Sequence, residues 1–103
     1  MVSAVLRIYD NAPGLVDAIE AHLDDVRGLM TGVAGFRAWN MIRTANGGYS
    51  LTVCDDKAGC DESVRLAADW IKQNVPNAGQ IPVPTIIEGT GVARITPTEM
   101  ITT

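Results

Sequence analysis

The stretch Thr44-Ala45-Asn46-Gly47-Gly48-Tyr49 lies close to the middle of the 103-residue chain and predicts a tight hairpin turn. Asn-Gly and Gly-Gly pairs readily supply the positive φ angles that short hairpin loops use. On each side of this turn the sequence pattern reads strand, helix, strand. We therefore expect a single domain over residues 1–103 in which the turn joins two similar halves.

The half before the turn begins with an alternating, β-branched strand over Ser3–Tyr9. One helix is expected next, because Pro13 suits a first helical turn and either Asp10 or Asn11 can cap it. Apolar residues then recur at positions 15, 19, 22/23, 26 and 30, which is the spacing of a helical stripe. Phe36–Thr44 follows as the second strand.

The half after the turn repeats this order. Tyr49–Asp55 is the predicted third strand, and a helix runs from between positions 57 and 61 to about Asn74, with Asp55 and Asp56 as capping residues. Ile86–Ile95 is the predicted fourth strand, and residues 96–103 form a short tail that can dock on a partner. Two βαβ halves of this kind predict an α+β, ferredoxin-like βαββαβ fold with a four-stranded antiparallel sheet.

Antiparallel pairing across the turn also predicts which residues share a face of the sheet. The more apolar face is expected to lie beneath the helices, and it carries Phe36, Ala38, Asn40, Ile42, Tyr49, Leu51 and Val53. The other face carries Trp39 and Met41. It stays uncovered, because both predicted helices lie on the first face. A second copy of the same sheet would cover it, so we expect a homodimer in which the two sheets form a shared barrel.

Composition narrows the class of protein. The net charge is −4, from 8 basic and 12 acidic residues, so the chain lacks the basic surplus of a protein that binds nucleic acid. No apolar run is long enough for a membrane span, and Met1–Tyr9 lacks the basic start of a signal peptide, so a cytoplasmic protein is expected. Cys54 and Cys60 do not match a redox or zinc spacing and are expected to be reduced and structural. With His22 as the single histidine, we expect no metal site.

Four local segments resemble the dimeric α/β-barrel superfamily and, within it, the antibiotic biosynthesis monooxygenase group. The resemblance runs over about residues 5–95, and its segments are Val5–Tyr9, Gly35-Phe36, Leu51–Val53 leading into Asp56–Ala58, and Ala67–Lys72. In cofactor-free, quinone-forming members, an Asn and a Trp near the second helix line a pocket between the helices and the sheet. Trp70 matches that Trp, and Asn74 lies one helical turn beyond it.

Haem-degrading members share a Trp like Trp70, but they also have an Asn on the first strand and a haem-binding His further along. This chain has Arg7 and Tyr9 on the first strand and no His between Lys72 and Pro82. The resemblance therefore implies an enzyme without a cofactor, in which Trp70 and Asn74 contact an aromatic substrate.

Several single residues have two interpretations each. His22 is either a general base in the pocket or a boundary residue bonded to a backbone carbonyl. Asn40, the one amide on an apolar face, binds either a ligand or neighbouring backbone. Tyr9 is either a proton donor or structural. The arginines at positions 7, 37 and 43 either hold a carboxylate or phenolate ligand or pair with acidic residues at a dimer rim.

The leading functional prediction is a small-molecule enzyme similar to cofactor-independent monooxygenases, acting on an aromatic or phenolic substrate. In this interpretation Trp70, Asn74 and Asn40 bind the substrate, and His22 or Tyr9 handles a proton. The alternatives are a homodimer that binds a small metabolite without catalysis and a purely structural homodimer.

Overall fold

The computed structural model describes residues 1–102, so Thr103, the last residue of the predicted tail and domain, lies outside the described part of the chain. The first half contains β1 (Ser3–Tyr9), α1 (Pro13–Ala21), α2 (Leu23–Thr31) and β2 (Phe36–Thr44). The second half contains β3 (Gly47–Cys54), α3 (Lys57–Asn74), a 3₁₀ turn η1 (Ala78–Gln80) and β4 (Thr85–Thr90). A short hairpin of β5 (Ala93–Ile95) and β6 (Met100–Thr102) follows.

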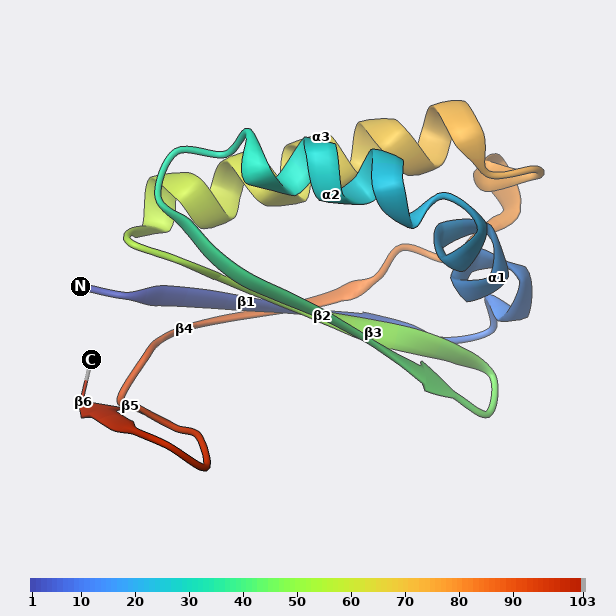
Figure 1. The fold of residues 1–103 in the computed structure, drawn as a ribbon. Coiled ribbons are helices and arrows are strands. Elements are labelled where there is room, and N and C mark those ends of the chain that lie inside the picture. Colours follow the sequence, from blue (N-terminus) through green and yellow to red (C-terminus); the bar gives the residue numbers. More distant parts are fainter. Residues whose placement is uncertain (103) are drawn as a thin grey trace.

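The main sheet has four antiparallel strands in the order β2-β3-β1-β4, and the helices lie on one of its faces (Figure 1). The predicted α+β, ferredoxin-like fold is therefore confirmed. Among residues 1–102, no helix is both long and apolar enough to cross a membrane.

The central turn forms as predicted. Its glycines are needed for close packing, however, and not for the positive φ angles that the sequence suggested. Thr44 pairs with Gly47 around a two-residue loop, and the positive φ angles among residues 1–102 belong instead to Asn11, Gly35 and Asn77. A Cβ on Gly47 would lie only 2.0 Å from the carbonyl oxygen of Tyr9. The glycines of the turn therefore permit a close approach to the end of β1.

The predicted first helix is broken into α1 and α2 at His22, whose backbone leaves the helical region at φ −129° and ψ 35°. Pro13 does begin α1, but the residue before it is Ala12, which supplies no side-chain cap. The cap of α3 agrees with the prediction: the carboxylate of Asp56 accepts a hydrogen bond of 3.0 Å from the backbone N–H of Gly59.

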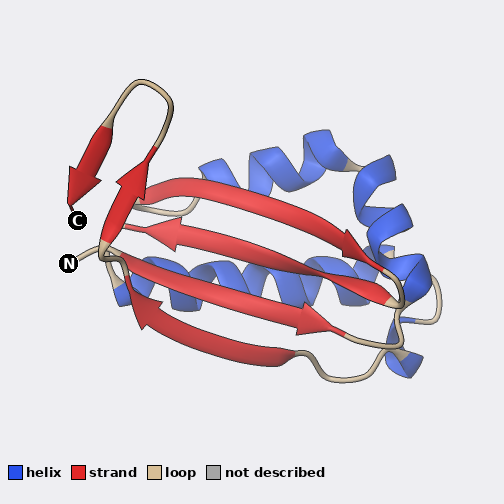
Figure 2. Cartoon of the chain, turned by 90° about the horizontal axis from the view of Figure 1, so that it is seen from below, coloured by secondary structure: helices blue, strands red, loops and turns tan. Residues whose placement is uncertain are grey.

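The predicted fourth strand is too long. β4 ends at Thr90, and the chain turns away at Gly91, whose N–H bonds to the carbonyl of Val2. Residues 93–95 pair instead with residues 100–102 of the predicted tail, and this hairpin projects beyond the sheet, away from the helices (Figures 1 and 2).

The predicted assignment of the two sheet faces is wrong. The residues that share each face were paired correctly along most of β2 and β3, but Trp39 and Met41 point toward the helices, together with Ser50, Thr52 and Cys54. The open face carries three cross-strand rows: Asn40-Leu51-Leu6-Ile87, Ile42-Tyr49-Ile8-Thr85 and Ala38-Val53-Ala4-Gly89. A bulge at Arg37 moves Phe36 to the helix side.

Candidate functional site

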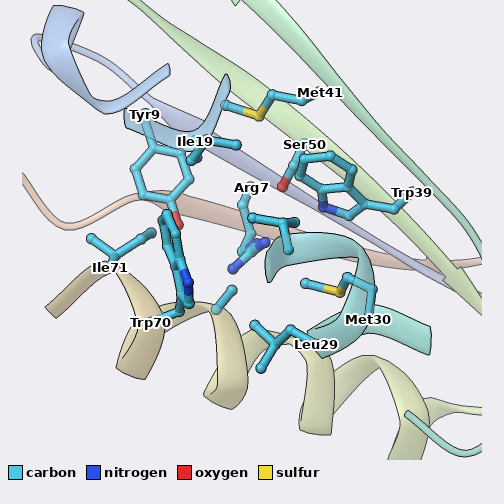
Figure 3. Close-up of a pocket in the computed structure, with 12 residues that line it drawn as sticks. Arg7, Tyr9, Ile19, Leu29, Met30, Trp39, Met41, Ser50, Trp70 and Ile71 are labelled. Atoms are coloured by element: carbon cyan, nitrogen blue, oxygen red, sulfur yellow. The ribbon is translucent and has the colours of Figure 1, made fainter. Parts of the chain in front are cut away.

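The candidate site is a small, partly open cavity between the helices and the middle of the sheet (Figure 3). Its lining comes from every layer of the fold, and most of it is apolar: Tyr9, Ile19, Val26, Leu29, Met30, Trp39, Met41, Ala67, Trp70 and Ile71, with Arg7 and Ser50 as the polar members. Both tryptophans of the chain are in this set. The cavity measures about 20 Å³, which is enough for a water molecule or for one polar group of a ligand.

Strand periodicity explains why β1 brings a charged residue into this space. Val5, Arg7 and Tyr9 alternate along the strand, and their exposed fractions are 0%, 4% and 5%, so all three project under the helices. Ser50 lies directly opposite Arg7 on β3, and Met41 lies opposite Ser50 on β2. Arg7 thus occupies the centre of a cross-strand row beneath the helices.

Arg7 is the most unusual residue of the site. Its Nε and Nη1 atoms are buried and have no hydrogen-bond partner among residues 1–102. The same holds, within that range, for Nε1 of Trp39 and the hydroxyls of Ser50 and Thr52. Buried polar groups are nearly always hydrogen-bonded, to protein or to ordered water. The unpartnered atoms of Arg7, Trp39 and Ser50 border the cavity, so a water molecule or a polar group of a ligand could satisfy them there.

The electrostatics of the site follow from burial. Loss of hydration lowers the pKa of Arg7, and the nearby Tyr9 opposes that change. Burial also raises the pKa of Tyr9 above its ordinary value, with the charge of Arg7 acting in the opposite direction. Tyr9 is therefore a neutral phenol at physiological pH and can donate a proton or a hydrogen bond.

Two of the arginines considered above have acidic partners within the chain. Arg37 bonds to Asp55 at 2.6 Å, and Arg43 bonds to both Asp17 and Glu20 at 2.7 Å. These pairs lie on the surface of one chain, where the sequence had suggested a rim between two. Arg7 has no acidic partner in the described chain, so only this arginine is available to a ligand in the cavity.

Of the predicted site residues, Trp70 and Tyr9 line the cavity together. His22 is exposed; its ring lies edge-on to Trp70 with a centroid distance of 5.8 Å, and its Nδ1 is 2.8 Å from the carbonyl oxygen of Ala18. Asn74 is also exposed, and its side chain donates to the backbone oxygen of Trp70 at 2.9 Å. These two residues therefore touch Trp70 from outside.

Asn40 is not near this cavity. It lies on the open face of the sheet, where the sequence had predicted the helix-covered face. It borders instead a wide, open groove beside α2 that Trp39 and Arg94 also line.

The buried face of α3 carries Cys60, Ser63 and Ala67. Trp70 and Ile71 follow Ala67 by three and four positions, so they lie on the same side of the helix and line the cavity with it. Cys54 and Cys60 are both free and buried, as predicted. No cluster of three or more His, Cys, Asp or Glu residues that could hold a metal ion occurs among residues 1–102.

Sequence reasoning missed Ile19, Leu29, Met30, Met41 and Ser50 as lining residues. The available signal was the alternation along β1, because Val5 and Tyr9 are plausible core residues and Arg7 lies between them. Placing Val5 and Tyr9 under the helices would have put Arg7, Ser50 and Met41 there too.

The helices and the sheet order define a small ferredoxin-like domain, with the candidate site between its two layers. Comparison with solved structures gives the same fold over most of the chain. The protein NE2512 of unknown function from Nitrosomonas europaea matches with a TM-score of 0.65 and 20% identity, over 93% of each chain. A putative antibiotic biosynthesis monooxygenase from Chloroflexus aurantiacus matches with a TM-score of 0.64 and 14% identity, over 93% of this chain and 98% of that one.

SnoaB, a cofactor-independent oxygenase from Streptomyces nogalater, matches with a TM-score of 0.52 and 17% identity, over 95% of this chain and 97% of that one. No protein-family model matches the sequence, and no curated protein matches it either. At these identities the likeness concerns the fold. It agrees with the resemblance read from the sequence: this chain has the fold of antibiotic biosynthesis monooxygenase-like proteins.

Proposed function

We propose that this protein is a small-molecule enzyme that oxidises an electron-rich aromatic substrate, such as a phenol, with O₂ and without a cofactor. The observation that carries the proposal is the cavity whose lining brings both tryptophans and Tyr9 together with a buried cation, Arg7. Flat aromatic walls suit an aromatic ring, and a few convergent polar groups suit its oxygen substituent. The fold shared with SnoaB and with a putative monooxygenase supports the same class of reaction.

In this proposal Trp70 forms one wall of the substrate site and Tyr9 donates a proton or a hydrogen bond. His22 and Asn74 act as positioning residues. The ring of His22 contacts Trp70 from the junction between α1 and α2, and the side chain of Asn74 donates to the backbone oxygen of Trp70 within α3. Asn40 would act at the open face of the sheet, away from the reacting atoms.

The proposed reaction converts a phenol into a quinone. The phenol enters the site as its phenolate, its proton having passed to bulk water, and the electron-rich phenolate passes one electron to O₂, which gives a phenoxyl radical and superoxide. These combine at a ring carbon to give a peroxide anion, which takes up a proton from water. The resulting hydroperoxide loses water to leave the second carbonyl group. One oxygen atom of O₂ enters the product and the other leaves as water, so phenol plus O₂ gives quinone plus water.

The test is turnover of a panel of phenols under ¹⁸O₂, followed by mass spectrometry of the products. We expect one labelled oxygen in the quinone and one O₂ consumed for each quinone formed. Trp70→Ala should lower kcat/KM by roughly tenfold or more, because it removes an aromatic contact with the ring. Arg65→Ala, a change on the exposed face of the same helix, is the matched control. Oxidation no faster than in buffer across the panel would refute the proposal.

A non-catalytic binding protein is the second candidate, and one observation favours it. The twelve side chains that line the cavity include no carboxylate and no imidazole, so no ordinary general base faces the ligand. Ligand binding without ¹⁸O incorporation would establish this alternative.

We further propose that the working form is a homodimer built on the open sheet face. The three rows of that face include no charged residue, and Ile42, Leu51 and Ile87 are exposed by 43%, 36% and 52%. A contiguous apolar surface of this kind needs cover, and a second copy of the same flat face is self-complementary. The β5–β6 hairpin projects from this side and exposes Ile95 and Met100, which extends the surface available to the second copy (Figure 1).

A further inference from the structure

Arg7 differs from the paired arginines of the chain in having both a buried position and no opposite charge. Arg37, Arg43 and Arg65 each contact at least one carboxylate, and their side chains are between 47% and 59% exposed. Arg7 is 4% exposed, and no ion pair involving it occurs within residues 1–102.

Such an arrangement is costly for a folded protein. A guanidinium group does not lose its proton in proteins, so burial cannot be relieved by neutralisation as it can for lysine or histidine. A buried charge normally has a counter-ion and a full set of hydrogen bonds. Here the titratable residue whose charge affects the pKa of Arg7 is Tyr9, whose own pKa is raised by burial and which therefore remains neutral.

The unpartnered polar groups around the cavity are all able to donate hydrogen bonds. Figure 3 shows the Arg7 guanidinium directed into the cavity between Trp70, Leu29 and Ser50, with the Trp39 indole beside Ser50. The Arg7 and Trp39 nitrogens can only donate hydrogen bonds, and the Ser50 hydroxyl can donate one. Within the described chain these donor atoms are unpartnered. Positive charge combined with several free donors is complementary to an anionic oxygen.

We propose that Arg7 anchors an anionic oxygen of the ligand, a carboxylate or an ionised phenol, with Ser50 and Nε1 of Trp39 completing its hydrogen bonds. The proposal rests on the proposed function only for the aromatic character of the rest of the ligand. It assigns the chemical class of the substrate and explains why the cavity needs no base: the charge of Arg7 favours the ionised form of a bound phenol.

The size of the cavity suits the anionic oxygen of the ligand, whereas the aromatic ring needs further space. Its volume of about 20 Å³ accommodates the oxygen but not an aromatic ring. The ring must therefore displace side chains on the helix side, where Leu29, Met30 and Trp70 line the space. Methionine adapts its shape at low cost, so Met30 on α2 and Met41 on β2 are suited to such repacking.

The test uses intrinsic fluorescence, because Trp39 and Trp70 are the only tryptophans and both line the cavity. The probes are benzoate and 4-nitrophenolate, each paired with a neutral analogue of similar shape, benzamide and 4-nitroanisole. We expect at least one anion to bind roughly tenfold or more tightly than its neutral partner, since a hydrogen bond to a charged group is considerably stronger than one between neutral groups. A preference for benzoate identifies the carboxylate as the source of the oxygen, and a preference for 4-nitrophenolate identifies the phenol.

Three variants separate the charge of Arg7 from its packing. Arg7→Met keeps the side-chain volume and should abolish the preference for the anion, while Arg7→Lys should keep part of it because the charge remains. Arg43→Met removes an exposed arginine and should leave binding unchanged. Arg7→Met should also raise Tm in the absence of ligand, because an unpaired buried charge is replaced by an apolar side chain; this shift also demonstrates that the variant folds.

Equal binding of the anions and their neutral analogues, binding of none of the four probes, or an unchanged anion preference in Arg7→Met would overturn the proposal. Failure of the proposed oxidation has a different signature. Tight anion binding through Arg7 without ¹⁸O incorporation would refute the enzyme and leave the anion site standing. Oxidation by the Arg7→Met variant at the wild-type rate would refute the anion site and leave the enzyme standing.

Discussion

At the scale of single residues, the molecule shows how much the position of one side chain depends on the face to which its strand is turned. Trp39 and Met41 were assigned correctly to one face from the sequence. The face itself was assigned wrongly, because the more apolar set of residues was taken to be the core. In this chain the more apolar set lies on the open face, and the helix-covered face contains the polar groups that line a cavity.

The two cysteines provide a prediction at this scale. Burial and the neighbouring Cys60 raise the pKa of Cys54 to about 11, and burial likewise raises the pKa of Cys60. The thiolate is the reactive form, so both residues should resist alkylation by iodoacetamide at about pH 8.5 in the native protein and react readily once it is denatured. Mass spectrometry of the alkylated chain measures this, and rapid native labelling at that pH would contradict the assignment.

The same pKa shifts predict the pH dependence of folding. The folded pKa of Cys54 lies above its value of 9.0 in the unfolded chain, so the folded state retains the proton longer. Burial shifts the pKa of Tyr9 in the same direction. The contribution of these groups to the free energy of unfolding should therefore be constant below about pH 9 and fall as the pH rises toward 11. A Cys54→Ala variant should show a shallower fall.

At the scale of elements, the sequence predicted β1, β2 and α3 with nearly correct bounds, because each has clear alternation, periodicity or capping. It did not predict the break at His22. The helical spacing of apolar residues continues through His22, so the pattern gives no sign of the break. The break appears only in the structure, where α2 takes a new direction over the sheet. It also merged β4 with β5, since no local signal shows that Gly91 bonds to Val2 and redirects the chain.

The cap of α3 gives a prediction for an element. Asp56→Ala removes the acceptor for the N–H of Gly59 and should lower the free energy of unfolding by about 1 kcal/mol. Asp61→Ala is a matched control in the same helix, because Asp61 pairs only with the exposed Lys57 and such pairs contribute little. Denaturant titration compares the two. A loss that is equal in both variants would show that the cap does not stabilise α3.

At the scale of the whole molecule, the open sheet face is the surface on which we propose that two copies assemble. Leu51 lies in the middle row of that face, between Asn40 and Leu6. Leu51→Lys places a charge at the centre of the proposed interface and should shift the protein from dimer to monomer in sedimentation velocity runs. Arg65→Ala, on the outer surface of α3, should stay dimeric. A wild-type protein that is monomeric at high concentration would refute the sheet-to-sheet dimer.

The proposed dimer also explains why the sequence could not predict which face of the sheet the helices cover. A sheet face that is apolar because it meets a second copy has the same pattern as one that is apolar because it meets helices. The pattern along β2 and β3 therefore identifies two faces but does not say which one the helices cover. Contacts from α1, α2 and α3 are needed for that choice, and they depend on the whole chain.

The central claim is that the cavity holds an anionic oxygen at Arg7, and a crystal structure of the protein with benzoate tests it most directly. We predict the carboxylate within hydrogen-bonding distance of Arg7, with its ring between Trp70 and Met30 and the side chain of Ser50 turned toward it. Benzoate bound elsewhere, or a cavity in which a water molecule alone contacts Arg7 at saturating benzoate, would contradict the account.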